Sequence, residues 1–113
     1  MKNKYSSKIK KLLKQVHPRL FITYKLEFKN CFGAIAGYVN GHIFISCGRF
    51  GIALRLPLET LDKVFKEEGA KHLKYFPKGH IKKEYAVLPR KIMENRQQFK
   101  GLIDISVKYA SLP

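Results

Sequence analysis

The sequence predicts an α+β fold, a mostly antiparallel sheet with helices packed on it. Apolar residues recur at helical spacing near both ends of the chain and once in its middle, whereas the segments between them alternate or run apolar over short stretches, as strands do. An Asn-Gly pair and further glycine turns separate these strands, which favours neighbours joined by hairpins. The expected order is α-β-β-β-β-α-β-β-α, without an internal repeat or linker, and indicates one domain, residues 1–113.

A first helix is expected from Ser6 or Ser7, since either hydroxyl can cap its first turn. Its apolar residues fall at i, i+3, i+4 and i+7, and the lysines of this segment lie mostly on the opposite face. The apolar stripe consists of Ile9, Leu12, Leu13 and Val16. His17 precedes Pro18, and the residue before a proline is disfavoured in the helical region, so the helix should end there.

Four strands should follow the first helix. Residues 22–29 alternate apolar and polar side chains without a break, which predicts a strand with one buried face. Residues 34–39 are apolar on both faces and predict an interior strand. Asn40-Gly41 is typical of a type I′ turn, so residues 42–47 should return beside that strand. A second glycine turn leads to a strand over residues 52–56, which completes an antiparallel meander.

The second half of the chain should add two helices and two strands. A helix is expected after Pro57, whose fixed φ suits a helix start, and should end before Gly69, because glycine readily adopts the left-handed conformation that follows a helix. Two short strands are expected over residues 72–76 and 83–88. A last helix should follow the proline after the second of these strands, with a capping-box pattern at Asn95.

The charge is the extreme feature of the composition. Twenty-three Lys and Arg stand against eight Asp and Glu, a formal net charge of +15, and such an excess attracts polyanions. The excess is uneven: residues 1–29 carry nine bases and one acid, residues 71–91 carry seven and one, and residues 57–70 carry two and four. A polyanion partner is therefore one expectation, although solvated lysine-rich faces also account for such a charge.

The cellular setting follows from what the sequence lacks. No segment has the roughly 18 apolar residues that a membrane span needs, and the basic N-terminus lacks the continuous apolar stretch of a signal peptide. We therefore expect a cytoplasmic protein without a membrane span. In that compartment Cys31 and Cys47 should stay reduced and act as packing residues. Whether either thiol is ever oxidised or binds a metal stays open at this stage.

The residue types that carry chemistry nominate no catalytic or metal site. A phosphate-binding loop needs glycines that open a helix, whereas the five glycines of residues 31–57 lie in strands and hairpins. Gly33 and Gly37 indicate a bulge or a close backbone approach in the sheet. The cysteines and histidines show no CxxC or HxxxH spacing, so no metal or cofactor is expected. No motif marks an activated nucleophile, and we expect no enzyme.

Two basic segments, residues 2–14 and 71–91, are the candidates for nucleic-acid contact. In the second segment, lysines are interleaved with Tyr75, Phe76 and Tyr85, a mixture suited to phosphate contact and base stacking. The first two aromatic residues could equally be core residues of a short strand, and the lysines could simply be solvated. The candidate phosphate-binding residues are Lys8, Lys11, Lys14, Lys71, Lys74, Lys78, Lys82 and Lys83.

Three short motifs follow one another along the chain. Cys-Phe-Gly-Ala begins at Cys31, Gly-Tyr-Val-Asn-Gly begins at Gly37, and Tyr-Ala-Val-Leu-Pro begins at Tyr85. Together they resemble the TfoX (Sxy) N-terminal domain family over about residues 30–110, in which Met-Phe-Gly-Gly, Gly-X-Tyr-X-Asp-Gly and Tyr-Tyr-X-X-Pro segments stand in the same order. The chain departs from that pattern at Cys31, Ala34 and Asn40. The matching motif residues are Phe32, Gly33, Gly37, Tyr38, Gly41, Tyr85 and Pro89.

The resemblance implies an α+β fold similar to secretion-chaperone-like domains and no established catalytic role. Full-length TfoX proteins have a second, C-terminal domain and are associated with the regulation of natural competence, and this chain resembles a divergent single-domain member. The leading expectation is a non-enzymatic regulatory or protein-interaction module, linked to competence or transcription regulation. The alternative is a basic accessory protein that binds nucleic acid through the two lysine segments. The partner, the pathway and a homodimer through a sheet face or edge stay open.

Overall fold

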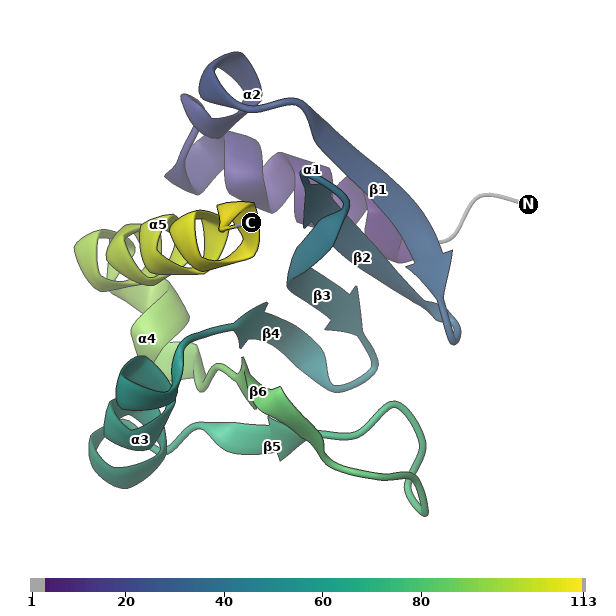
Figure 1. The fold of residues 1–113 in the computed structure, drawn as a ribbon, viewed down its shortest axis with the longest axis vertical. Coiled ribbons are helices and arrows are strands. Elements are labelled where there is room, and N and C mark those ends of the chain that lie inside the picture. Colours follow the sequence, from purple (N-terminus) through teal and green to yellow (C-terminus); the bar gives the residue numbers. More distant parts are fainter. Residues whose placement is uncertain (1–3, 113) are drawn as a thin grey trace.

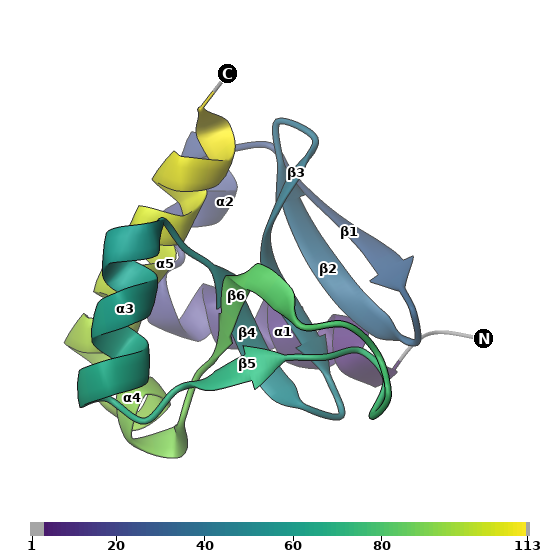
Figure 2. The ribbon, with the colours of Figure 1, turned by 60° about the horizontal axis from the view of Figure 1, so that its bottom comes forward.

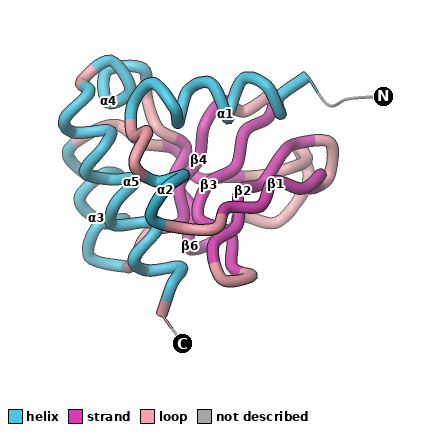
Figure 3. Tube along the Cα trace, turned by 90° about the horizontal axis from the view of Figure 1, so that it is seen from above, coloured by secondary structure: helices cyan, strands magenta, loops and turns pink. Residues whose placement is uncertain are grey.

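Residues 4–112 are described by the computed structural model of the chain, which places one six-stranded antiparallel sheet beside five helices (Figures 1 and 3). The helices are α1 (Lys4–Val16), α2 (Leu20–Thr23), α3 (Leu58–Glu67), α4 (Arg90–Glu94) and α5 (Arg96–Ser111), and the strands are β1 (Leu26–Cys31), β2 (Ala34–Val39), β3 (His42–Gly48), β4 (Gly51–Arg55), β5 (Lys71–Leu73) and β6 (Lys82–Val87). Neighbouring strands follow the order β1-β2-β3-β4-β6-β5. The predicted α+β class and the antiparallel meander of the first four strands are confirmed.

The hairpin between β2 and β3 has the predicted turn. Asn40 and Gly41 both have positive φ angles, 52° and 78°, as a type I′ turn requires. At Gly37 the pairing of β2 with β3 skips one position, so β3 carries an extra residue, Phe44, in a β-bulge. A Cβ atom on Gly37 would lie 2.7 Å from the Ile45 side chain, which confirms the close approach expected at this glycine.

The core lies between the sheet and the helices, on the side we call the helix face. α1 and α5 pack against β2 and β3 there, and α5 also contacts β4 (Figure 3). Ser106 joins α5 to the sheet, because its Oγ lies 2.5 Å from the Phe44 carbonyl oxygen and 2.7 Å from that of Arg55. The largest fully buried side chains of this core are Phe44, Phe99, Ile9, Leu13, Leu20, Ile45, Leu54, Leu56, Ile92, Ile103 and Val39.

The first helix begins earlier than expected. α1 includes Lys4, so Ser6 and Ser7 lie inside the helix and the predicted cap is wrong. The reason is that Tyr5, four residues before Ile9, is partly buried against the core and extends the apolar stripe toward the N-terminus. The helix ends directly before the His-Pro pair, as predicted.

The strand expected over residues 22–29 is wrong in its first half. β1 begins only at Leu26, because the chain first forms the single helical turn α2. Within that turn the Tyr24 N–H donates to the Leu20 carbonyl oxygen at 3.0 Å, and the Leu20 side chain is buried in the core. Burial of this one leucine therefore outweighs the alternating pattern that follows it, which shows how tertiary packing overrides a local strand signal.

In the second half of the chain, the end of α3 and the start of α5 lie where glycine and asparagine predict them. Gly69 has a φ of 77°, and the Ala70 N–H donates to the Val64 carbonyl oxygen at 3.1 Å, which is the predicted glycine-terminated end of α3. The last helix, expected as one element, is divided into α4 and α5. It divides because Asn95 is extended and caps α5 by accepting a hydrogen bond from the Gln98 N–H. None of the helices within residues 4–112 is long and apolar enough to cross a membrane.

The strand expected over residues 72–76 is shorter than predicted. β5 ends at Leu73, after a register shift against β6 that follows His72. Tyr75 and Phe76 therefore belong to the β5–β6 loop, residues 74–81, and are not strand residues. In Figure 2 this loop extends beyond the ends of β5 and β6 and curves toward β1 and β2. As loop residues, Tyr75 and Phe76 both bring their rings against Phe32 of the turn between β1 and β2.

Candidate functional site

The side of the sheet turned away from the helices, here called the open face, is built on small residues. Ala36, Ser46 and Ala53 lie side by side on three neighbouring strands and are fully buried. The β5–β6 loop covers them, since the Tyr75 hydroxyl lies 3.1 Å from the Ser46 Oγ. Small side chains on this face thus leave room for an aromatic residue from a distant loop.

The turn between β1 and β2 carries an aromatic residue in an unfavourable backbone conformation. Phe32 has a φ of 50°, which is rare for a bulky side chain, and Gly33 follows with a φ of 82°. Phe32 is 64% exposed, yet its ring centroid lies 5.4 Å from that of Tyr75 and 5.7 Å from that of Phe76. The turn therefore holds an exposed ring in place beside the β5–β6 loop.

Tyr75 is the centre of this aromatic cluster. Its ring packs edge to face against Phe50, which lies in the turn between β3 and β4, at a centroid distance of 5.7 Å. The Lys82 Nζ lies 5.9 Å from the centroid of the same ring, a cation–π distance. Three connecting segments, far apart in sequence, thus meet at one tyrosine.

Two tyrosines of the open face, Tyr75 and Tyr85, have raised pKa values. Burial raises the pKa of Tyr75, because its phenolate would lose water, and the Cys31 side chain raises it further against the lowering effect of the hydrogen bond with Ser46. Burial also raises the pKa of Tyr85 to about 12, although the nearby Arg55 charge lowers it. Both groups are therefore neutral phenols at physiological pH, and that of Tyr75 hydrogen-bonds with Ser46.

Three hollows with shared walls lie along the open face, and we call them together the aromatic groove. Their volumes are about 520, 190 and 90 Å³. Lys82 lines the first and second hollows, whereas Phe32 and Tyr75 line the second and third, so each hollow adjoins the next. The aromatic residues of the groove are Phe32, Tyr38, Phe50, Tyr75, Phe76 and Tyr85.

The groove carries an excess of positive charge. Its charged lining residues are Arg49, Arg55, Lys82, Lys83 and Glu84. The Arg55 Nε donates to Glu84 Oε2 at 2.8 Å, and the Tyr109 hydroxyl donates to the same oxygen at 3.2 Å, so the carboxylate is already satisfied. The other three cations have no carboxylate partner within residues 4–112. The groove therefore presents positive charge to whatever enters it.

The eight candidate phosphate-binding lysines are divided between two faces of the molecule. Of those in the second segment, Lys82 and Lys83 line the groove, whereas Lys74 and Lys78 lie in the β5–β6 loop outside the lining and Lys71 lies on the edge strand β5. Lys8, Lys11 and Lys14 lie on α1, which packs against β2 and β3 from the helix face. The two basic segments of the sequence therefore do not form one surface.

The seven motif residues of the family resemblance have mostly conformational roles. Phe32 and Gly33 form the β1–β2 turn, Gly37 lies at the bulge, Gly41 completes a hairpin, Pro89 precedes α4, and Tyr38 and Tyr85 line the groove. The lining residues Arg49 and Phe50 belong to no motif and were not predicted from the sequence. An aromatic residue next to glycine in a tight turn was the only local signal, because such turns rarely use one.

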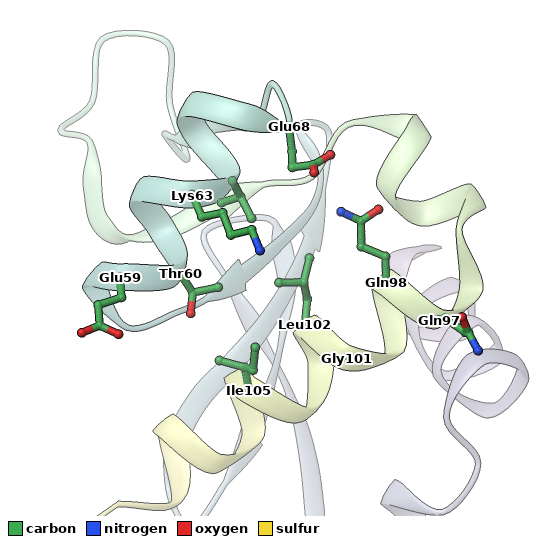
Figure 4. Close-up of a pocket in the computed structure, with 10 residues that line it drawn as sticks. Glu59, Thr60, Lys63, Glu68, Gln97, Gln98, Gly101, Leu102 and Ile105 are labelled. Atoms are coloured by element: carbon green, nitrogen blue, oxygen red, sulfur yellow. The ribbon is translucent and has the colours of Figure 1, made fainter.

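A separate hollow of about 450 Å³ lies between α3 and α5 (Figure 4). Lys63 of α3 and Gln98 of α5 point into it above the buried Leu102, as Figure 4 shows. Glu68 lines the same hollow, with its carboxylate 3.6 Å from the Lys91 ammonium. Charges of both signs and carboxamides are mixed there, and this mixture favours no particular class of ligand.

The cysteines and histidines have structural surroundings. Cys47 is fully buried, and burial raises the pKa of its thiol, against the smaller effect of the Lys8 charge. Cys31 is partly buried and, like Cys47, forms no disulfide. The buried His17 pairs through Nε2 with Asp104, while its Nδ1 has no hydrogen-bond partner. Within residues 4–112 no three Cys, His, Asp or Glu side chains are grouped closely enough to hold a metal ion.

Comparisons with known proteins leave the groove as the basis for any functional argument. No family model, no curated protein and no solved structure matches the chain. The likeness to TfoX N-terminal domains therefore stays a prediction from short motifs. The exposed rings, the cations and the neutral tyrosines of the groove are the features that bear on function.

Proposed function

We propose that the chain is a non-enzymatic regulatory module of the TfoX N-terminal type, and that it recognises its partner with the aromatic groove. The observation that carries this proposal is the gathering of six aromatic residues and three cations without a carboxylate partner, among residues 4–112, on the open face. Aromatic and arginine side chains dominate the energetics of binding surfaces. The resemblance supplies the process, regulation of competence or transcription in the cytoplasm.

The titratable groups of the groove suit binding better than catalysis. A general acid or base works best when its pKa lies near the operating pH. Burial moves the pKa of Tyr75 and Tyr85 upward, away from that range, to about 12 for Tyr85. Glu84, the only carboxylate of the lining, is held by Arg55 and Tyr109. These contacts stabilise a fixed surface in which both tyrosines stay protonated and the Glu84 carboxylate is held in place.

Photo-crosslinking in cells that express the chain tests whether the groove is the contact surface. Benzoylphenylalanine replaces Phe76, which is 54% exposed in the groove, and in a matched control it replaces Ile22, an exposed apolar residue of α2 outside the groove. We expect discrete high-mass adducts from position 76 and none of the same mass from position 22. Identical adducts from both positions, or none from position 76, would overturn the proposal.

A further inference from the structure

We infer that the aromatic groove takes single-stranded nucleic acid, with bases stacked on Phe32 and Phe76 and phosphates held by Arg49, Lys82 and Lys83. This inference rests on the proposed function and names the partner of the same groove. It goes beyond charge alone, because it assigns separate tasks to the rings and to the cations.

Two rings of the groove are exposed to solvent. Phe32 is 64% exposed and Phe76 is 54% exposed, and their rings meet at an interplanar angle of 68°. More than half of each side chain is therefore accessible to a flat ligand. Bases of a single strand can stack on such rings, whereas bases of a duplex are already stacked and paired. The rings therefore favour a single strand.

The backbone at Phe32 has an unfavourable conformation. A φ of 50° favours glycine or asparagine over a bulky aromatic residue, and the left-handed conformation costs an L-residue stability. Unfavourable conformations of this kind gather at functional sites, where the surrounding structure holds them. Tyr75 and Phe76 hold the Phe32 ring through their contacts. These ring contacts do little more than offset the cost of the left-handed conformation, so stability alone gives an aromatic residue no clear net advantage over asparagine here, and a stacking role accounts for it.

The cations of the groove are distributed along it. Lys82 lies between the first and second hollows and Arg49 lines the third, so positive charge lies on both sides of the ring cluster. A groove in which cations follow a backbone and aromatic rings receive the bases is the common design of single-strand sites. The net charge of +15 adds long-range attraction for such a polyanion.

A protein partner fits the same groove less well. Lysine is depleted at the centre of protein–protein interfaces, where arginine and aromatic residues are enriched. Here two of the three cations without a carboxylate partner within residues 4–112 are Lys82 and Lys83, and a lysine ammonium is a point charge suited to phosphate. The inference therefore commits to nucleic acid and makes a protein partner an outcome of the test.

Fluorescence anisotropy with labelled oligothymidine and oligouridine of about 12 nucleotides, within the length that single-strand sites occupy, tests the inference against a duplex of equal length. We expect tighter binding of the single strands and an affinity that falls as salt rises. Phe76→Ala and Phe32→Asn should each lower the affinity roughly tenfold with little change in salt dependence. Lys82→Gln combined with Lys83→Gln should reduce the steepness of the log–log salt dependence by about 1.4.

The matched control removes equal charge from the other basic surface. Lys8→Gln combined with Lys11→Gln on α1 should leave most of the affinity intact, and urea midpoints establish that every variant is folded. Three results would each overturn the inference: duplex binding as tight as single-strand binding, an unchanged affinity in Phe76→Ala, or an equal loss in the α1 pair. The last result would indicate attraction by overall charge without a defined groove.

The crosslinking experiment separates failure of this inference from failure of the proposed function. If the wild-type chain binds neither oligonucleotide near physiological salt while position 76 crosslinks to a protein, the inference fails and the regulatory module stands. If position 76 gives no adduct at all, both fail. An adduct from position 76 that nuclease treatment removes supports both.

Discussion

The two faces of one sheet are built from different side chains. The helix face is filled with large residues such as Phe44 and Phe99, which are fully buried. The open face carries Ala36 and Ala53 beneath a loop, and the neighbouring ring of Phe32 is more than half exposed. The difference indicates that stability comes mainly from one face and recognition from the other. Substitutions should therefore divide into those that change the unfolding free energy and those that change binding.

The largest expected effect is on the helix face. Phe99→Ala should lower the free energy of unfolding by about 3–5 kcal/mol, because it removes a fully buried ring from the core. Phe76→Ala removes a phenyl ring from an exposed loop and should change the free energy of unfolding by less than about 1 kcal/mol. Urea denaturation followed by far-UV circular dichroism measures both. Similar losses in the two variants would abolish the distinction between the faces.

A smaller loss of stability is expected at Gly37, where the helix face leaves no room for a Cβ atom. Gly37→Ala should cost about 1–3 kcal/mol of unfolding free energy, because the new methyl group would lie 2.7 Å from the Ile45 side chain. Gly101→Ala is the matched control, since apart from its chain neighbours and the nearby backbone of α5 nothing lies within 4 Å of its Cβ position. That substitution should stabilise the protein by about 0.5–1 kcal/mol, as alanine does in helices. Destabilisation by both would contradict the packing argument.

The open face should show its own pH dependence. The Tyr85 pKa is about 12 in the folded protein, whereas tyrosine in an unfolded chain ionises near pH 10. The unfolded state therefore loses its proton first, so the contribution of Tyr85 is fully present below about pH 10 and is lost as pH rises toward about 12. Tyr85→Phe should make the alkaline fall in urea midpoint shallower than in the wild type. An unchanged alkaline profile would show that this phenol is not desolvated.

The smallest expected change in stability occurs at the most exposed ring of the groove. Phe32→Asn relieves a left-handed conformation that costs a bulky residue roughly 1–2 kcal/mol, and it loses two ring contacts worth about 0.5–1.5 kcal/mol each. The free energy of unfolding should therefore stay within about 1 kcal/mol of the wild type. Thermal and urea unfolding measure it. A large loss would mean that Phe32 serves stability.

Local signals predicted much of the fold. The turn at Asn40-Gly41, the end of α3 at Gly69 and the cap at Asn95 each depend on a backbone requirement within a few residues, and each was readable in the sequence. The helical turn α2 and the late start of β1 could not be predicted from residues 22–29. They depend on burying Leu20 in a core that distant strands and helices complete. Packing between distant segments decides such cases.

The candidate site was predictable only in part. The mixture of lysine and aromatic residues in 71–91 pointed to Tyr75 and Phe76 as well as to Lys82, which do line the groove. Arg49 and Phe50 were missed because they come from another turn, and only the strand order and the path of the β5–β6 loop bring that turn to Tyr75. The spacing of Phe50 and Tyr75 in the sequence does not indicate that their rings come into contact.

The β-bulge at Gly37 determines how the chain would respond to changes in length. Strands normally alternate faces, but the bulge allows the consecutive residues Phe44 and Ile45 both to enter the core. On either side of this pair, Ile43 lines the groove and Ser46 lies beneath Tyr75. Deleting Phe44 would remove the bulge and restore regular alternation, so Ile43 and Ser46 would keep their side of the sheet while the core would lose one buried ring. The extra residue thus adds a large side chain to the core without turning the groove residues of β3 inward.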